Sequence, residues 1–429
     1  MVVGVAVRGV VALAAVGSLA LTGCVSGADR ASGGAEVDPA ALQGELVFWD
    51  STVLDTEAPV VRDLIGSFEE AYPDVSVRYE NVPEEKLAER FAKAVQADSV
   101  PDVVRVPTTT TATLAKQGYL ENLSGSPLDT PDEFLPAAFA SAQVDDRLMG
   151  VPQTGEPVIM ASSAGTMERA GVGVPSSWDE VAQQAESYSE PDAYPLQAPA
   201  SGLEVLPFVY STGGGMLDTA ASRVIINDGP SVAGFEAGVA LATAGALRPA
   251  AKTESEQEAL KAFQDGKVGS IFTTPARLRT LFGSDPFRDG QGLLVGAPPA
   301  AGDDGPATAY LGYNVSVTSA SQSPDASQAL VAALTSASGQ QELATRAGLV
   351  PTRGEVYEAD EVSGDPMMSG YLAAMQAAQP TPMIARVQSL YGPIGQEWLN
   401  MVDGRTSPRT GANAIVRLWL PYLPEGYRD

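Results

Sequence analysis

The sequence predicts an α/β protein in which buried strands alternate with amphipathic helices. The first apolar run, "GELVFWD" (44–50), ends in polar residues, and "VSVRYENV" (75–82) and "DVVRV" (102–106) follow as further strand candidates. Between these runs lie two apolar stripes at helical spacing: Val61, Leu64, Ile65 and Phe68, then Leu87, Phe91, Ala94 and Val95. This alternation is typical of a parallel sheet, whose ligands bind beyond the carboxyl ends of the strands.

The same alternation continues in the second half of the chain. Val158 to Ala161 predicts a strand, and Ser177 and Glu180, three residues apart, predict a capping box at the start of a helix. "GKVGSIFTT" (266–274) and "GLLVGAPPA" (292–300) predict buried strands, and "YLGYNVSVTS" (310–319) predicts another. A helix with cap chemistry is expected at Ser323-Pro324, followed by an apolar stripe: Ala326, Ala329, Leu330, Ala333 and Leu334.

The N-terminus has the pattern of a lipoprotein signal. Residues 1–23 carry one charge, Arg8, and a short apolar run typical of a signal peptide rather than a membrane span. The run ends in "LTGC", which resembles a bacterial lipobox and predicts a lipid on Cys24 after cleavage; the alternative is a core cysteine. Because Cys24 is the only cysteine, it forms no internal disulfide. Residues 24–43 are small and polar, as in a flexible tether.

Composition excludes several classes of function. The chain has 429 residues, 44% of them hydrophobic and 18% charged, which is enough for two folded lobes with separate cores. Its formal charge of -27 argues against nucleic acid and against binding to anionic lipid through the protein surface. No histidine is present, so Ser–His and Cys–His catalytic sites and imidazole metal ligands are excluded. We therefore expect a binding protein without cofactor or metal, although a glycosidase-type carboxylate pair stays formally open.

Several segments carry a family resemblance. "FEEAYPDVSVRYENV", "LAKQGYLENL", "GVPQTGEPVIM", "MERAGVGVPSSWDEV", "AFQDGKVGSIF" and "GQQELATRAGLVPTRGEVY" occur in this order, and "YGPIGQEWLNMVDGRTSPRTGANAIVRLW" follows near the C-terminus. Each segment is weak by itself. Their order and spacing from Gly44 to the C-terminus resemble the extracellular solute-binding proteins of ABC importers, family 1, of the maltodextrin-binding type.

The resemblance implies a type II periplasmic-binding-protein-like fold, with a sheet flanked by helices in each lobe and a ligand cleft between the lobes. The expected boundaries are 44–153 plus 311–358 for lobe 1 and 154–310 plus 359–429 for lobe 2. Hinge closure around a solute is the transition known for such proteins. The resemblance further implies a monomer that is lipid-anchored outside the cytoplasmic membrane of a Gram-positive, actinobacterial cell. It would deliver a sugar or oligosaccharide to a membrane permease.

Candidate ligand residues follow the predicted strands. Trp49, Asp50 and Ser51 end the first strand, where Trp49 offers a ring face to a sugar and Asp50 an acceptor for its hydroxyls. The alternative is a core tryptophan and a helix-capping aspartate. Thr108, Thr109 and Thr110, with Thr111, follow the strand "DVVRV", at positions where sugar-binding relatives place an acidic residue and an aromatic. Their hydroxyls either hydrogen-bond the ligand or, for one of them, cap the helix.

The remaining candidates come from the resemblance. Gln153 and Glu156 fall near the crossing between lobes, and Gly214 lies in a glycine run that either approaches ligand or makes a turn. The other positions are grouped near later strands and the last helices: Thr274, Arg277, Gly312, Tyr313, Asn314 and Tyr391. Tyr391 matches an aromatic that stacks on sugar in relatives, or is a core tyrosine.

Departures from the family pattern leave the solute open. Thr274, Pro275 and Arg277 stand where relatives often have Gly-Pro-Trp, so the tryptophan is absent, and Ala161-Ser162-Ser163 replaces a Tyr-Asn-Lys. Gln379 precedes Pro380 where an arginine is common. A polyamine, peptide or metal chelate is therefore the alternative solute, and a surface sensor lipoprotein without transport is the alternative role.

Overall fold

A computed structural model describes residues 42–428, apart from 54, 200, 250–254 and 303–304. The predicted signal peptide, Cys24 and all but the last two residues of the predicted tether lie outside the described residues. Among the described residues, no helix has both the length and the apolar character needed to cross a membrane.

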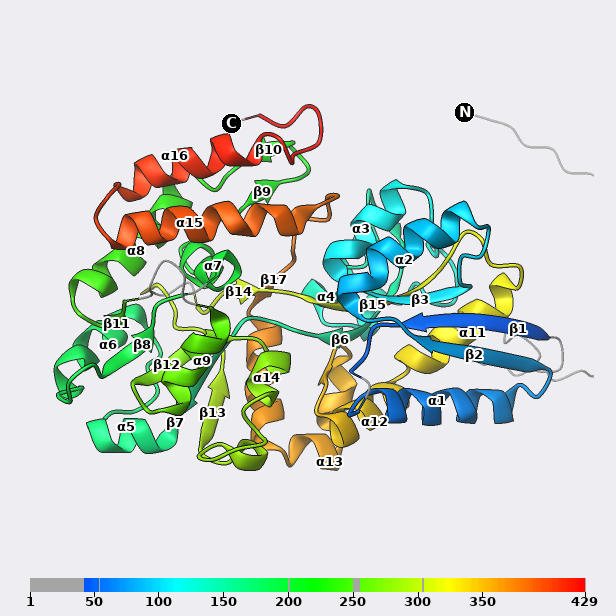
Figure 1. Ribbon diagram of the computed structural model, residues 1–429, viewed down its shortest axis with the longest axis horizontal. Coiled ribbons are helices and arrows are strands. Elements are labelled where there is room, and N and C mark those ends of the chain that lie inside the picture. Colours follow the sequence, from blue (N-terminus) through cyan, green and yellow to red (C-terminus); the bar gives the residue numbers. More distant parts are fainter. Residues whose placement is uncertain (1–41, 54, 200, 250–254, 303–304, 429) are drawn as a thin grey trace, which may run out of the picture. The chain divides into compact units, whose positions relative to one another are not determined.

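The first sheet has the strand order β16-β6-β15-β3-β1-β2 (Figure 1). Its strands are β1 (Gly44–Asp50), β2 (Val75–Asn81), β3 (Val103–Pro107), β6 (Val151–Gly155), β15 (Gly312–Val317) and β16 (Val350–Pro351). β1 runs parallel to β2 and β3, as predicted. In contrast, β15 runs antiparallel to β3 and β6, and β16 antiparallel to β6. The sheet is therefore mixed, with parallel pairs among β1, β2 and β3 and antiparallel pairs at β15 and β16.

The second sheet has the order β11-β8-β12-β7-β13. Its strands are β7 (Ile159–Ser163), β8 (Tyr194–Gln197), β11 (Leu247–Arg248), β12 (Val268–Thr273) and β13 (Leu293–Gly296). β12 pairs parallel with β8 and antiparallel with β7. The chain leaves the first sheet after β6 and enters the second at β7, it returns at β15, and after β16 it crosses once more to α14 (Pro366–Gln376), which packs on β13. The first two crossing segments hydrogen-bond each other, since Glu156 N donates to Leu311 O over 2.7 Å and Leu311 N donates to Glu156 O over 3.3 Å.

Helices cover both faces of the first sheet, and we call this sheet and its helices the first lobe. α1 (Ala58–Ala71), α11 (Pro324–Thr335) and α12 (Ala337–Ala347) bury their apolar residues in a core with Leu46, Phe48 and Val315. α2 (Glu84–Gln96) and α3 (Thr108–Lys116) pack on the other face, in a core with Trp49 and Val104. Alternation of side chains along β1 explains this division, because neighbouring residues of a strand point to opposite faces. α4 (Pro136–Ala140) lies beside β6.

The second lobe is the second sheet and the helices around it. Its largest core joins α7, α8, α15 and α16, where Trp398 stacks on Phe208 with ring centroids 5.3 Å apart. The helices are α5 (Ala164–Ala170), α6 (Trp178–Gln183), α7 (Gly202–Tyr210), α8 (Gly229–Thr243), α9 (Glu256–Gln264), α10 (Pro275–Arg279), α14 (Pro366–Gln376), α15 (Tyr391–Val402) and α16 (Pro408–Trp419). α14 packs on β13.

Short elements complete the described chain. The short strands are β4 (Gln143–Val144), β5 (Arg147–Leu148), β9 (Leu217–Asp218), β10 (Arg223–Val224), β14 (Thr308–Ala309) and β17 (Ala378–Gln379). The short helices are η2 (Pro131–Glu133), η3 (Gln184–Ser187), η4 (Arg288–Gly290), η6 (Gly354–Glu358), α13 (Asp360–Ser363) and η7 (Val387–Leu390). β14 pairs parallel with β17, which adds a further contact near the segments that connect the sheets.

Three local predictions need correction. The run "GLLVGAPPA" forms β13 at the edge of its sheet, and Leu294 there is 44% exposed, so the strand is not buried. Ser177 accepts a hydrogen bond from Glu180 N, but the Glu180 carboxylate accepts from Ser176 N rather than closing the box. Ser323 precedes α11 without a side-chain cap hydrogen bond; Pro324 at the first position already removes one free N–H.

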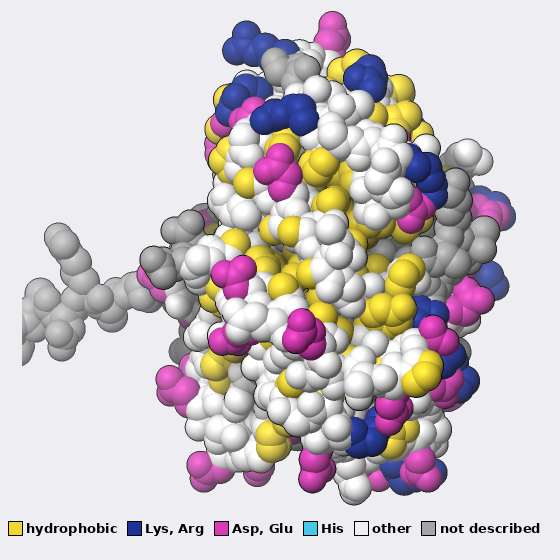
Figure 2. Space-filling view, turned by 90° about the vertical axis from the view of Figure 1, so that its left-hand side faces the viewer, with side chains coloured by type: hydrophobic (Ala, Val, Ile, Leu, Met, Phe, Trp, Pro, Cys, Tyr) yellow, Lys and Arg dark blue, Asp and Glu magenta, His cyan; other side chains and the backbone are white. Residues whose placement is uncertain are grey.

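Charge is unevenly distributed over the face of the second lobe seen in Figure 2. Acidic side chains dominate its lower part, and basic side chains gather at the upper edge. Arg405, Arg409 and Arg417, in and just before α16, are exposed. The net charge of -27 therefore does not make every surface acidic.

Candidate functional site

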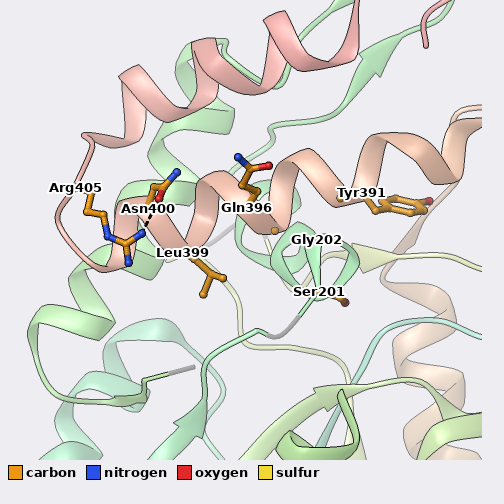
Figure 3. A pocket seen from close by; sticks show the side chains of 9 residues that line it. Ser201, Gly202, Tyr391, Gln396, Leu399, Asn400 and Arg405 are labelled. Carbon is orange, nitrogen blue, oxygen red and sulfur yellow. Dashed lines mark hydrogen bonds between the residues drawn. The ribbon is translucent and has the colours of Figure 1, made fainter. Parts of the chain in front are cut away.

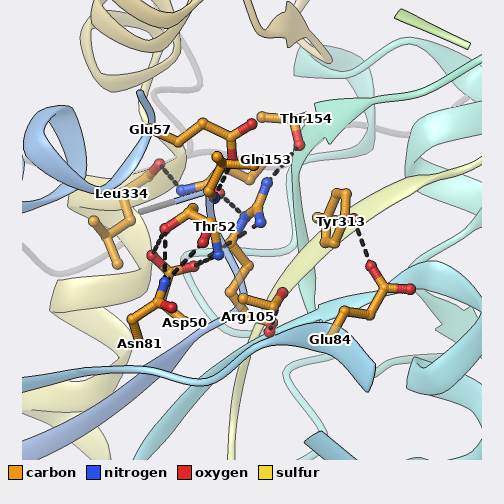
Figure 4. Close-up of polar contacts among 12 residues, drawn as sticks. Asp50, Thr52, Glu57, Asn81, Glu84, Arg105, Gln153, Thr154, Tyr313 and Leu334 are labelled. Atoms are coloured by element: carbon orange, nitrogen blue, oxygen red, sulfur yellow. Dashed lines mark hydrogen bonds and ion pairs between the residues drawn. The ribbon is translucent and has the colours of Figure 1, made fainter. Parts of the chain in front are cut away.

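The carboxyl end of β1 points into a buried polar network instead of presenting free groups (Figure 4). Asp50 is fully buried, and its carboxylate accepts hydrogen bonds from Thr52 N (3.1 Å), the Thr52 hydroxyl and the Tyr79 hydroxyl (2.9 Å). Burial raises the pKa of Asp50, while the nearby Arg105 and these hydrogen bonds act in the opposite direction. The geometry assigns Asp50 to the interior of the lobe and leaves little of its acceptor capacity for a ligand.

Arg105, in the middle of β3, joins several of the predicted residues. Its Nε donates to the Gln153 side chain over 2.7 Å and its Nη2 to the Thr154 hydroxyl over 3.1 Å. Its guanidinium lies 3.9 Å from Asp50 Oδ1 and 3.9 Å from the ring centroid of Tyr313. Asp50, Gln153 and Tyr313 are thus brought together, but through an arginine that is 1% exposed and that sequence reasoning did not select. The only signal was a charged residue inside an otherwise apolar strand.

Two further candidates near β1 and β15 are anchored by neighbours. Trp49 is buried and forms a T-shaped ring pair with Phe91, and the Arg90 guanidinium lies 4.4 Å from its ring centroid. These contacts agree with the core alternative for this tryptophan. The Ser51 hydroxyl donates to Arg105 O over 3.3 Å. The Tyr313 hydroxyl donates to Glu84 over 2.7 Å, which fixes the ring that covers Arg105 (Figure 4).

The four threonines divide into two pairs. α3 begins at Thr108 itself, with Pro107 before it, and no threonine hydroxyl caps the helix, so that expectation was wrong. Thr108 and Thr111 are fully buried, whereas Thr109 and Thr110 are partly exposed. The Thr111 hydroxyl accepts from Asn314 Nδ2 over 3.1 Å, and the Thr108 hydroxyl has no partner among the described residues. Only Thr109 and Thr110 have side chains open to a solute.

Asn314 and the glycine candidates have structural contacts. Asn314 is fully buried and donates to Ser141 O over 3.0 Å as well as to Thr111. A Cβ added to Gly214 would lie 2.6 Å from the Cα of Ser231, and one added to Gly312 would lie 2.4 Å from Thr154 O. Each glycine therefore permits close packing of backbone, which is a sufficient reason for it without a ligand.

A second cluster lies where the chain crosses between the sheets. Glu156, directly after β6, accepts a hydrogen bond from Ala276 N at the start of α10 over 2.9 Å, and Thr274 adds a side-chain hydrogen bond. Burial raises the pKa of Glu156, Arg279 opposes this shift, and the negative charge of Glu57 adds to it. Two predicted residues, Glu156 and Thr274, thus meet here.

Arg279 and Glu57 belong to this cluster although the sequence did not indicate them. Arg279 Nη2 lies 3.4 Å from Glu57 Oε1 and 3.7 Å from Glu156 Oε1. The predicted Arg277 instead forms ion pairs with Glu204 and Glu256. Residues two apart on a helix point in different directions, so "ARLR" contains one arginine on each side of α10. Sequence pattern alone gave no way to choose between them.

A groove runs along α15 beside the start of α7 (Figure 3). Its volume is 530 Å³, within the range of about 300–1,000 Å³ that is usual for small-molecule sites. It is lined by Ser201, Gly202, Tyr391, Gly392, Gly395, Gln396, Leu399, Asn400 and Arg405. Tyr391 lies at one end, and Asn400, which accepts a hydrogen bond from Arg405 over 2.9 Å, lies toward the other.

The chemistry of this groove suits a ligand with polar and apolar faces. Burial raises the pKa of Tyr391 to about 12, so its hydroxyl, which lies 3.5 Å from the Thr381 hydroxyl, stays protonated at neutral pH. Its ring and Leu399 offer apolar surface, while Gln396 and Asn400 offer amide donors and acceptors. None of the described residues that line the groove is a carboxylate, although the protein is strongly acidic. The described residues contain no group of acidic or sulfur side chains arranged to hold a metal ion.

The chain forms two lobes on mixed sheets, with paired crossing segments and polar groups near the crossing. This is the architecture of a two-lobed binding protein. Residues 52–341 match the model of the bacterial extracellular solute-binding protein family. This is well over half of the chain, so the protein belongs to that family and acts by binding a solute. The predicted type II fold is confirmed by the solved structures that resemble it.

Three relatives illustrate the likeness. The GacH receptor of Streptomyces glaucescens, solved unliganded and with acarbose, has 29% identity and a TM-score of 0.76, covering 90% of this chain and all of its own. The binding protein for cyclic α-maltosyl-1,6-maltose from Arthrobacter globiformis has 19% identity and a TM-score of 0.79, with 90% and 100% coverage. An uncharacterized lipoprotein from the oleD 5′ region of Streptomyces antibioticus is 28% identical over 206 residues, which are 46% of this chain and 43% of that protein.

Proposed function

We propose that this protein is the solute-binding lipoprotein of an ABC importer and that its solute is a saccharide. The observation that carries the proposal is the similarity to the GacH receptor, which is 29% identical to this protein and is covered over its whole length. That receptor was solved in complex with acarbose. The groove along α15 supports it independently, because an aromatic ring, an aliphatic side chain and amides match the mixed surface of a sugar.

Binding is proposed to close the lobes about the crossing segments. A solute in contact with both lobes stabilises the closed state only by its higher affinity for that state. The proposed contacts are Thr109, Thr110, Glu156 and Tyr391, with the side chains around Arg105 in a supporting role. The lobe boundaries 44–153 plus 311–358 and 154–310 plus 359–429 are part of the same proposal. No histidine is available for nucleophilic catalysis, so capture rather than turnover is proposed.

The anchoring and delivery steps complete the proposal. Cleavage before Cys24 would leave a lipid on that residue, and residues 24–43 would tether the monomer outside the cytoplasmic membrane. The likeness to a lipoprotein of Streptomyces antibioticus supports this location and an actinobacterial origin. The closed, loaded protein would then dock on the permease subunits of the importer.

Thermal unfolding of residues 36–429 with a panel of saccharides tests the proposal. Neutral mono-, di- and oligosaccharides are compared with amino acids and polyamines as controls. A ligand at about 100 times its dissociation constant should add about 2.7 kcal/mol to the free energy of unfolding. A shift with one class of saccharide is expected. A shift only with amino acids or polyamines would contradict a saccharide solute while leaving solute binding intact.

A further inference from the structure

The groove along α15 is built on one face of that helix. The residues of α15 that line it recur at intervals of three and four positions, so they lie on the same side of the helix: Gly392, Gly395, Gln396, Leu399 and Asn400. The start of α7 packs closely against this side, since a Cβ added to Gly202 would lie only 1.9 Å from Tyr391 O. The groove is therefore walled by closely packed backbone, with the side chains of Gln396, Leu399 and Asn400 along it.

Arg405 is the one charged residue among the described residues that line this groove. α15 ends at Val402, and Gly404, with φ of 69°, turns the chain back so that Arg405 N donates to Asn400 O over 2.9 Å. Such a turn needs the left-handed conformation that glycine adopts without strain. Figure 3 shows the result: Arg405 lies at one end of the groove and Tyr391 at the other.

The guanidinium of Arg405 keeps donors that a ligand can use. Its Nη1 donates to Asn400 Oδ1 over 2.9 Å, and its Nη2 forms an ion pair with Asp403. A guanidinium carries five N–H donors, so these two contacts with described residues leave the others available. The side chains of Arg405 and Asp403 are 40% and 38% exposed, and exposed ion pairs of this kind contribute little to stability. Arg405 is therefore open to an anionic group of a ligand in the groove.

The acidic residue at the start of α7 does not offset Arg405. The Glu204 carboxylate accepts a hydrogen bond from Ser201 N over 3.3 Å and lies 3.6 Å from Arg277 Nη1. Its charge is thus balanced by Arg277, and its side chain is only 7% exposed. In a chain with a net charge of -27, this groove has the opposite local character, since a single cation and none of the described carboxylates lines it.

We propose that this groove takes an acidic oligosaccharide, in which one sugar ring lies on Tyr391 and the carboxylate of another unit binds Arg405. At about 1.5 Å per residue, α15 carries Asn400 about 13 Å along its axis from Tyr391, which is more than one sugar ring covers. The ligand must then contain more than one sugar unit. This inference rests on the proposed function, because it specifies the kind of saccharide that binds at the same groove.

A carboxylate fits Arg405 better than a phosphate does. The guanidinium is planar and matches a carboxylate with two parallel N–H···O bonds. A phosphate monoester carries a charge of about -1.5 to -2 at neutral pH, and one arginine that already faces Asp403 would compensate this charge only in part. A uronic acid unit is therefore the expected feature of the ligand.

The test compares saccharides that differ only in the negative charge. Residues 36–429 are titrated calorimetrically with digalacturonate, trigalacturonate and cellobiuronate, each against its full methyl ester. At least one acid should bind about tenfold or more tightly than its ester, and this preference should shrink at high salt. Arg405→Gln should abolish the preference and preserve the binding of the ester. Arg409→Gln, which removes an exposed arginine of α16 outside the groove lining, should preserve both.

A second variant separates recognition of charge from general damage to the fold. Asp403→Asn removes the carboxylate that shares Arg405, so the affinity for the acid should rise and the affinity for the ester should stay the same. Equal binding of every acid and its ester, a preference that survives Arg405→Gln, or weaker binding of the acid to Asp403→Asn would overturn the inference and leave saccharide binding intact. Failure of these and of all neutral saccharides to bind would instead refute the proposed function, and the inference with it.

Discussion

Replacing Arg105 with methionine should destabilise the first lobe strongly. The substitution keeps a long apolar side chain in β3 but removes the cation that lies 3.9 Å from Asp50 and the donors to Gln153 and Thr154. Asp50 is fully buried, so its carboxylate would remain in the interior without a compensating charge. Breaking a buried ion pair in this way costs about 3–5 kcal/mol.

The cost should depend on pH in a defined direction. Burial already raises the pKa of Asp50, and loss of Arg105 would raise it further because the arginine favours the ionised form. A carboxyl whose pKa is higher in the folded protein than in the unfolded chain loses stability as the pH rises through the folded value. The destabilisation by Arg105→Met should therefore be largest near neutral pH and become smaller in acid.

Urea unfolding of the wild type, Arg105→Met, Asp50→Asn and the double variant measures this coupling. The double variant has no charge left to bury, so it should recover a large part of the loss seen in Arg105→Met. A cost below about 1 kcal/mol for Arg105→Met, or no recovery in the double variant, would refute the view that Arg105 and Asp50 form a coupled pair.

Further substitutions test other parts of the structure. Thr108→Val should leave the free energy of unfolding unchanged or raise it by about 1 kcal/mol, because the buried hydroxyl has no partner among the described residues. Thr111→Val should lower it by about 1–2 kcal/mol, because the substitution removes the acceptor of Asn314. Chemical denaturation of the two variants measures both changes. Gly392→Trp should fill the groove along α15 and weaken saccharide binding in calorimetry, while Gly392→Ala, whose Cβ meets no atom within 4 Å, should bind normally. Glu156→Gln should remove the gain in stability that the wild type shows as the pH falls through the raised folded pKa of Glu156; pH-dependent melting that is identical in both proteins would contradict this.

Much of the fold was predictable because strand and helix signals are local. The apolar runs of β1 and β3 and the stripe of α1 needed only side-chain period and composition. The position of β13 at a sheet edge was not predictable in this way, since "GLLVGAPPA" has the same character as a buried strand. Whether a strand lies at the edge or in the centre of a sheet depends on which other strands pair with it, and those strands lie far away in the chain.

Polar residues after the predicted strands could be selected from the sequence, but the contacts that they make could not. Asp50 at the end of β1 and Gln153 in the middle of β6 do lie together, yet they contact Arg105, whose importance depends on burial that a sequence does not display. The choice between Arg277 and Arg279 depends on which side of a five-residue helix faces Glu57 and Glu156. Contacts between residues about 50 positions apart decide the first case, and contacts between residues more than 100 positions apart decide the second.

Calorimetric titration of residues 36–429 with the saccharide that gives the largest thermal shift is the most direct test of saccharide capture. One saccharide should bind per chain, and Tyr391→Ala, which removes the aromatic ring at the end of the groove, should weaken binding about tenfold or more. Absence of heat with every saccharide, or unchanged affinity in Tyr391→Ala, would contradict a saccharide site at this groove.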